Sequence, residues 1–126
     1  MLNGLPILIV EDEALIALDL ADAIMQIEGK PVGPVATVAE ALSLLDETSF
    51  EAAILDANLI DRDVTPLVLA LIDREIPFVI HTGTGLPAEL ALLHPTLTVI
   101  PKPARSTLVL AALLQRLSAD RGRFEQ

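Results

Sequence analysis

The stretch that decides how this chain folds is Glu51-Ala52-Ala53-Ile54-Leu55-Asp56-Ala57-Asn58-Leu59. A short apolar run that ends in a carboxylate is typical of a buried strand in a parallel sheet. We therefore expect Asp56 at the point where a strand leaves the sheet. Ligands of open α/β folds bind outside the carboxyl ends of the strands, so Asp56 is a candidate site residue. An aspartate at this position can also simply cap the following turn.

The composition fits one soluble, aliphatic domain. The chain has 126 residues, of which 52% are hydrophobic, and no apolar run approaches the roughly 18 residues of a membrane-spanning helix. It contains no Trp, no Tyr and three Phe, so little is available to stack on a nucleobase or a flavin ring. We expect a core of Leu, Ile, Val and Ala.

Charge and cysteine content exclude several classes of function. The formal net charge of −10 would repel a phosphate backbone, so we expect no direct binding to nucleic acid. The lack of cysteine excludes disulfides, thiolate zinc sites and iron–sulfur clusters. The chain enters its first strand without a signal-peptide pattern, so we expect a cytoplasmic protein with no membrane partner.

Apolar strand-like runs alternate with segments of helical periodicity along the whole chain. Strands are predicted at 6–10, 31–35, 52–55, 77–83 and 98–103, and helices at 15–27, 38–47, 66–72, 86–93 and 106–117. Gly33 and Pro34 place the second strand at an edge, Thr37 and Glu40 have the spacing of a capping box, and Pro95 keeps the fourth helix short. The alternation predicts a parallel sheet with helices on both faces. We expect one domain over residues 1–119 and a frayed tail over 120–126.

Four of the predicted strands end in residues that carry chemistry. The first ends in Glu11 and Asp12, the third in Asp56, the fourth in Thr82 and the fifth in Lys102. A parallel sheet brings these ends to one edge, where crowded carboxylates need a compensating charge. Magnesium is the compensator that such oxygen ligands favour, and it commonly bridges to phosphoryl groups.

This arrangement suits phosphoryl transfer to a carboxylate. With Mg²⁺ bound, Asp56 would attack a phosphorus centre and form an acyl phosphate. Lys102 would neutralise one phosphoryl oxygen, and Thr82 would donate a hydrogen bond to another.

Four short segments resemble the receiver domain of two-component response regulators, and the match covers essentially the whole chain. These segments are Ile9–Glu13, Leu55–Leu59, Thr82-Gly83 and Lys102-Pro103. The resemblance implies that Asp56 is the phosphoacceptor, Thr82 the switch hydroxyl and Lys102 the phosphoryl contact. It also implies a cis peptide bond before Pro103.

The resemblance further implies the metal ligands and the partners. Glu11, Asp12, Asp56 and the backbone carbonyl of Asn58 would hold Mg²⁺. The phosphodonor would be a sensor histidine kinase or a histidine phosphotransfer protein. The chain would catalyse only its own phosphorylation and dephosphorylation, and it would signal by protein–protein contact as a monomer or weak dimer. The expected fold is a five-stranded parallel sheet, doubly wound in the flavodoxin-like strand order 2-1-3-4-5, in three α/β/α layers.

Some positions depart from the usual receiver pattern. Val99 stands where receivers usually carry an aromatic residue in the fifth strand. Both Val99 and the short fourth helix, together with Pro77-Phe78 ahead of Thr82-Gly83, resemble an alphaproteobacterial subset with a Phe-Ala-Thr-Gly-Tyr (FAT GUY-like) signature. The signature's first, second and last residues are replaced here by Ile80, His81 and Thr84.

Three other functions compete with this interpretation. A flavodoxin-like electron carrier would need a phosphate-binding loop after the first strand and aromatic residues for the flavin. A haloacid-dehalogenase-type phosphatase has a second aspartate where this chain has Asn58. A phosphorylation-independent interaction module stays open because of Glu11 and Val99.

Single residues also have simpler interpretations. Glu11, Asp12 and Glu13 favour the start of a helix through its macrodipole. Thr82 is compatible with an ordinary turn, and Lys102 with an exposed lysine. The two histidines, His81 and His94, are assigned no catalytic role.

Overall fold

The computed structural model describes the backbone of residues 2–124 and the side chains of residues 2–119. Its centre is a five-stranded sheet in which every neighbouring pair is parallel, in the order β2-β1-β3-β4-β5. The strands are β1 (Pro6–Val10), β2 (Lys30–Val35), β3 (Ala52–Leu55), β4 (Phe78–Thr82) and β5 (Val99–Pro101). Both the parallel sheet and the predicted strand order are confirmed.

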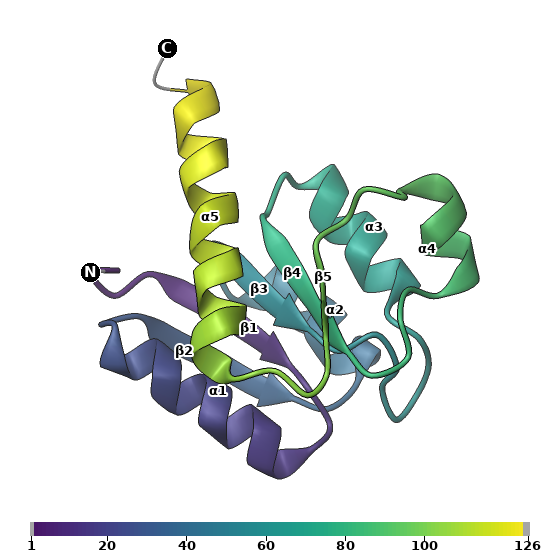
Figure 1. Ribbon diagram of the computed structural model, residues 1–126, viewed down its shortest axis with the longest axis horizontal. Coiled ribbons are helices and arrows are strands. Elements are labelled where there is room, and N and C mark those ends of the chain that lie inside the picture. Colours follow the sequence, from purple (N-terminus) through teal and green to yellow (C-terminus); the bar gives the residue numbers. More distant parts are fainter. Residues whose placement is uncertain (1, 125–126) are drawn as a thin grey trace.

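Five helices cover the sheet and make the outer two layers (Figure 1). They are α1 (Ala14–Gln26), α2 (Val38–Glu47), α3 (Thr65–Asp73), α4 (Ala88–Leu93) and α5 (Ser106–Phe124). The N-cap half of the capping box predicted for α2 is present, because the Thr37 hydroxyl oxygen accepts a hydrogen bond from the Glu40 amide at 3.1 Å. The Glu40 carboxylate in turn accepts a hydrogen bond from the Thr37 hydroxyl group at 2.9 Å. The short α4 also agrees with the sequence.

The last helix is longer than expected. Leu117 is too early as its end, because α5 continues to Phe124. No proline follows Leu117 to break the helix, so backbone hydrogen bonding can continue. The predicted tail 120–126 therefore begins as helix, and its residues 125 and 126 lie outside the described residues. The division of the chain at residue 119 stays a prediction.

The core has two halves, one on each face of the sheet. Leu8 and Val10 of β1 pack on the side of α2, α3 and α4, whereas Ile7 and Ile9 pack on the side of α1 and α5. Side chains of a strand alternate between the two faces, so a central strand buried on both must be apolar throughout. Leu20, Ile24 and Leu113 complete the second half from the helices.

Strand register brings the site residues to one level. Val10 is paired with Leu55, and the Asp56 amide donates to the Val10 carbonyl at 2.9 Å. The Lys102 amide likewise donates to the Thr82 carbonyl at 2.8 Å. The residues that follow β1, β3, β4 and β5 therefore leave the sheet side by side. Within residues 2–124, none of the helices is long and apolar enough to cross a membrane.

Candidate functional site

Three carboxylates meet at the carboxyl edge of the sheet. Glu11, Asp12 and Asp56 each offer one oxygen, and these oxygens lie within 4.8 Å of one another. Glu11 and Asp56 are buried, with 4% and 7% of their surface exposed, and Asp12 is half-buried. The sequence predicted this meeting from the strand ends, and the structure brings the three residues together.

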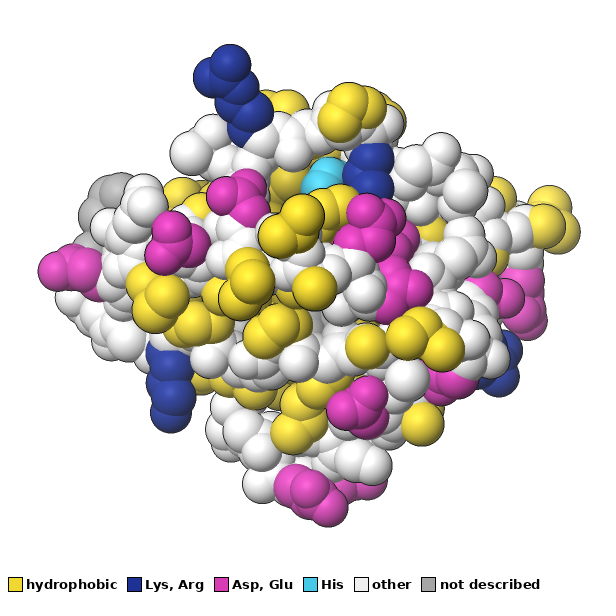
Figure 2. Space-filling model, turned by 90° about the horizontal axis from the view of Figure 1, so that it is seen from below, with side chains coloured by type: hydrophobic (Ala, Val, Ile, Leu, Met, Phe, Trp, Pro, Cys, Tyr) yellow, Lys and Arg dark blue, Asp and Glu magenta, His cyan; other side chains and the backbone are white. Residues whose placement is uncertain are grey.

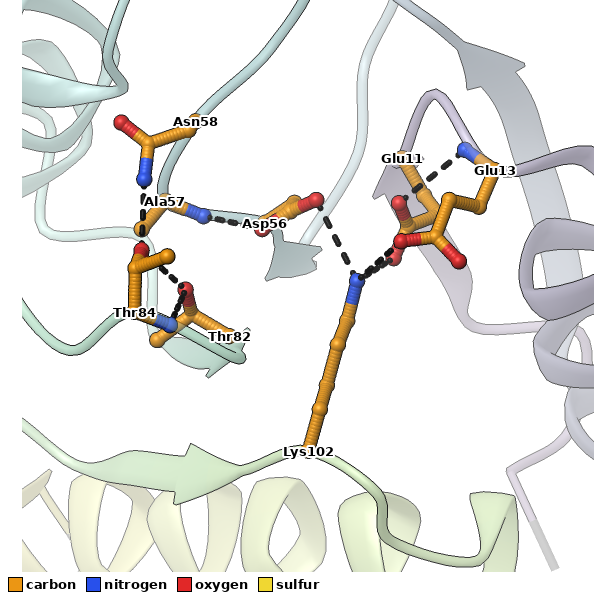
Figure 3. Close-up of polar contacts among 8 residues, drawn as sticks. All are labelled: Glu11, Glu13, Asp56, Ala57, Asn58, Thr82, Thr84 and Lys102. Carbon is orange, nitrogen blue, oxygen red and sulfur yellow. Dashed lines mark hydrogen bonds and ion pairs between the residues drawn. The ribbon is translucent and has the colours of Figure 1, made fainter.

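Lys102 lies against these carboxylates (Figure 3). Its Nζ atom is 2.9 Å from Glu11 Oε1, 3.3 Å from Asp56 Oδ2 and 3.5 Å from Glu13 Oε1. Burial alone would lower the pKa of Lys102, but the hydrogen bond to Glu11 and the charge of Asp56 outweigh it, and the pKa is raised. Lys102 is therefore charged, and its ammonium group is directed at the candidate phosphoacceptor.

The environment of the Glu11 carboxyl group disfavours its charged form. Burial raises its pKa to about 7, although hydrogen bonds from Lys102 and from the Glu13 amide act in the opposite direction. The Asp56 charge adds to the increase. A single lysine therefore does not compensate the buried negative charge, and a hard divalent cation fits this set of oxygen ligands.

Asp56 faces a cavity of about 370 Å³. One of its oxygens, Oδ1, accepts a hydrogen bond from the Ala57 amide at 2.7 Å, while Oδ2 faces Lys102. Other residues that line the cavity are Asp12, Glu13, Asn58, Thr82, Gly83, Thr84 and Lys102. Two other residues that the sequence predicted for the site, Asn58 and Thr82, thus line the same cavity as Asp56.

A hydrogen-bonded chain links the loops after β3 and β4 (Figure 3). Asn58 Nδ2 donates to Thr84 Oγ1 at 2.6 Å, and Thr84 Oγ1 lies 3.2 Å from Thr82 Oγ1. The Thr84 amide also donates to Thr82 Oγ1 at 3.2 Å. Sequence reasoning named Thr82 and Asn58 but not their link through Thr84.

Sequence reasoning assigned no role in the site to Glu13, although Glu13 belongs to the acidic segment Ile9–Glu13, and none to Thr84. Glu13 follows the predicted acidic pair and reaches Lys102 from the N-cap position of α1. Thr84 forms a Thr-Gly-Thr pattern with Thr82, and this pattern was the available signal for a second hydroxyl. The cis bond expected before Pro103 is present.

His81 is buried next to the site, and the sequence analysis assigned it no catalytic role. It is 3% exposed, and neither ring nitrogen has a hydrogen-bond partner among the described residues. Burial lowers its pKa, and the positive charge of Lys102 lowers it further. The imidazole is therefore held in its neutral form.

The molecular surface around the site combines acidic and apolar side chains. Figure 2 shows acidic side chains against a basic one on the face seen from below, with hydrophobic side chains spread over the surface beside them. Two of the exposed apolar residues, Leu15 and Leu18 of α1, are 83% and 62% exposed. Leu15 lines a cavity together with Glu13 and Lys102, so it adjoins the site.

Comparison with known proteins identifies similar folds and sequences. No protein-family model and no curated protein sequence matches the chain. Among solved structures, the chain is 40% identical to SdrG from Sphingomonas melonis Fr1, with 90% of this chain and 99% of that one covered and a TM-score of 0.73. The BeF3-activated conformation of SdrG from Pseudomonas melonis Fr1 matches at 40% identity over 93% and 98% of the two chains, with a TM-score of 0.71. The non-phosphorylated HemR receiver domain from Leptospira biflexa is 25% identical over 91% and 92%, with a TM-score of 0.70.

Proposed function

This chain belongs to the family of response-regulator receiver domains, and on that premise we propose that it accepts a phosphoryl group on Asp56 in a Mg²⁺-dependent reaction. The donor would be a sensor histidine kinase or a histidine phosphotransfer protein. The observation that carries the proposal is the position of Asp56, which lies beside a cavity, 3.3 Å from the Lys102 ammonium and within one acidic cluster with Glu11 and Asp12.

The side chains have separate tasks in this reaction. A carboxylate oxygen of Asp56 forms the new bond to phosphorus while the bond from phosphorus to the donor's imidazole nitrogen breaks. Lys102 stabilises the negative charge on one phosphoryl oxygen, and Thr82 donates a hydrogen bond to another. The chain would act on no other substrate.

The metal ligands would be Glu11, Asp12, Asp56 and the backbone carbonyl of Asn58. When bound, Mg²⁺ supplies positive charge that lets an anionic phosphoryl group approach these carboxylates. The raised pKa of Glu11 supports the proposal, because a carboxyl group in this position gains most from a nearby cation.

The output would be a change in protein–protein contacts. Thr82 and Lys102 lie at the base of the surface made by β4, α4 and β5, so we expect phosphorylation to alter that surface. The exposed Leu15 and Leu18 of α1 are available for contact with a partner next to the site. We expect the chain to act as a monomer or weak dimer.

The test uses a small phosphodonor, acetyl phosphate, with and without Mg²⁺. Intact-mass spectrometry should detect one added phosphoryl group only when Mg²⁺ is present. Asp56→Asn should abolish the adduct, whereas Asp73→Asn, the same change at an exposed aspartate in α3, should not alter it. Equal labelling of wild type and Asp56→Asn would refute the assignment. Turnover of many phosphate esters would instead indicate a phosphatase.

A further inference from the structure

We propose that Thr84 is a positioning residue that directs the Thr82 hydroxyl proton toward the phosphoryl group on Asp56. Thr84 would do so as the middle member of the hydrogen-bonded chain Asn58–Thr84–Thr82. This inference rests on the proposed function, since it needs an anion beside Asp56. It deepens that function by assigning a residue that sequence reasoning left out of the site.

Two of the three hydrogen bonds among Asn58, Thr84 and Thr82 have a fixed direction, because their nitrogen atoms can only donate. The Asn58 amide nitrogen can only donate, so the Thr84 hydroxyl oxygen accepts at that contact. The Thr84 backbone amide also only donates, and it places a second donor on the Thr82 oxygen. The one bond whose direction is open lies between the two hydroxyls, 3.2 Å apart.

An anion in the cavity selects between the two directions. If Thr82 donates to Thr84, the Thr82 proton is used within the chain. If Thr84 donates to Thr82, the Thr82 oxygen is held from both Thr84 groups and its proton is free to meet a phosphoryl oxygen. Hydrogen bonds in such a series polarise one another, so the second arrangement also makes Thr82 a stronger donor.

The Thr82 hydroxyl group is the buried member of this hydrogen-bonded chain. Thr82 is only 2% exposed, whereas Asn58 and Thr84 are exposed at the mouth of the cavity. Water can replace a partner of the outer residues more easily than a partner of the buried hydroxyl. Thr84 therefore connects a buried donor to a loop that solvent reaches, and it links the segment after Asp56 to the segment after β4.

The experiment measures binding of beryllofluoride, a phosphoryl mimic, in the presence of Mg²⁺ by NMR titration. Thr84→Val keeps the shape of the side chain but removes its hydroxyl group, and we expect it to raise the half-saturating concentration roughly two- to tenfold. Thr84→Ser should restore the wild-type value. Thr48→Val makes the same change at an exposed threonine after α2 and should have no effect.

A double-mutant cycle and a spectroscopic signature separate this role from a merely structural one. Asn58→Ala should weaken binding as well, and the combined variant should be weakened by less than the sum of the two effects. The side-chain amide resonances of Asn58 should move in Thr84→Val but not in Thr84→Ser.

Two different results would overturn the inference. If Thr84→Val binds beryllofluoride as tightly as the wild-type protein or more tightly, the role of Thr84 is refuted and the proposed function is not. Fully additive effects of Thr84→Val and Asn58→Ala would have the same meaning. Absence of beryllofluoride binding by the wild-type protein would refute the proposed function, and the inference with it.

Discussion

Lys102 contributes one positive charge to a place where three carboxylates approach it. Its ammonium contacts Glu11, Glu13 and Asp56, and Asp12 is a fourth acid, whose carboxylate lies beside those of Glu11 and Asp56. Either protonation of a carboxyl group or binding of a cation can reduce this excess of negative charge. The raised pKa of Glu11 indicates that protonation of Glu11 reduces it in the metal-free protein.

The pKa of Glu11 predicts an unusual dependence of stability on pH. Its pKa is about 7 in the folded protein and near 4.5 in the unfolded chain, so the folded state holds a proton that the unfolded state has lost. Without Mg²⁺, the contribution of Glu11 to the free energy of unfolding should therefore decrease as the pH rises from about 4.5 to about 7. Urea unfolding across this range measures it, and Glu11→Gln should remove the decrease. An equal decrease in Glu11→Gln would assign the effect to another group.

A second residue-scale prediction concerns the unpartnered imidazole of His81. His81→Leu removes two buried nitrogens that lack hydrogen-bond partners among the described residues, so we expect it to increase the free energy of unfolding by roughly 1–3 kcal/mol at about pH 8. The measurement is urea unfolding. The same change at the less buried His94 serves as the control. If His81→Leu is less stable than the wild-type protein, the packing of the imidazole ring contributes more to stability than its unsatisfied nitrogens cost.

The lowered pKa of His81 gives this prediction a pH signature. As the pH falls below about 6.5, His81 is protonated in the unfolded chain but stays neutral in the folded protein. The contribution of His81 to the free energy of unfolding should therefore decrease as the pH falls below about 6.5. His81→Leu should lack this loss. Its sign is opposite to that of the Glu11 effect, so the two variants separate the two groups.

At the scale of elements, the loop that follows β3 and the proposed phosphoacceptor Asp56 is hydrogen-bonded to a neighbouring helix. Asp61, in the loop between β3 and α3, accepts hydrogen bonds from the Val38 and Ala39 amides at 2.9 and 3.1 Å. These amides lie in the first turn of α2, where helices leave donors unsatisfied. The segment that follows Asp56 is thereby tied to the start of α2.

Removal of this contact should loosen the start of α2. We expect Asp61→Ala to increase the amide exchange rates of Val38 and Ala39, measured by NMR hydrogen exchange. Asp63→Ala is the matched control, since Asp63 accepts from the Thr65 amide at α3 instead. Exchange at Val38 that is unchanged in Asp61→Ala, or equally fast in both variants, would contradict the specific link.

The same contact should respond to acid. Hydrogen bonds from Val38 and Ala39 hold the pKa of Asp61 below its usual 3.8. The folded state therefore binds the proton less readily than the unfolded chain, and the stabilisation present above pH 3.8 is lost as the pH falls through the lowered pKa.

At the scale of the whole molecule, charge of one sign dominates. The formal net charge is −10, and such self-repulsion opposes a compact state. Two kinds of cation effect are expected, namely general screening by salt and specific binding at the acidic cluster. Only the second depends on Glu11, Asp12 and Asp56.

Magnesium should therefore stabilise the fold beyond the effect of ionic strength. We expect MgCl2 to raise the melting temperature more than NaCl at equal ionic strength, because a ligand that binds only the folded state stabilises it by mass action. Asp12→Asn should lose this difference, and Asp73→Asn should keep it. Differential scanning calorimetry measures both. Equal increases with the two salts would leave no support for a specific site.

The arrangement of the sheet could be predicted because it depends on short-range patterns. Apolar runs that end in Glu11, Asp56 and Lys102 mark strand ends, and parallel strands place such ends on one edge whatever the helices do in detail. The end of α5 could not be predicted from the periodicity, because the helix continues past Leu117 through the mostly polar residues 118–123 to Phe124, without a proline to stop it.

The sequence by itself determined the α/β fold, the strand ends and the meeting of Glu11, Asp12, Asp56 and Lys102. Only the tertiary structure decided which groups contact one another: the Thr84 chain, the reach of Glu13 to Lys102, the burial that raises the pKa of Glu11, and the isolation of His81. The physical reason is range. Strand formation follows from neighbours along the chain, whereas hydrogen bonds and desolvation depend on side-chain distances between strands and on the helices that exclude water from them.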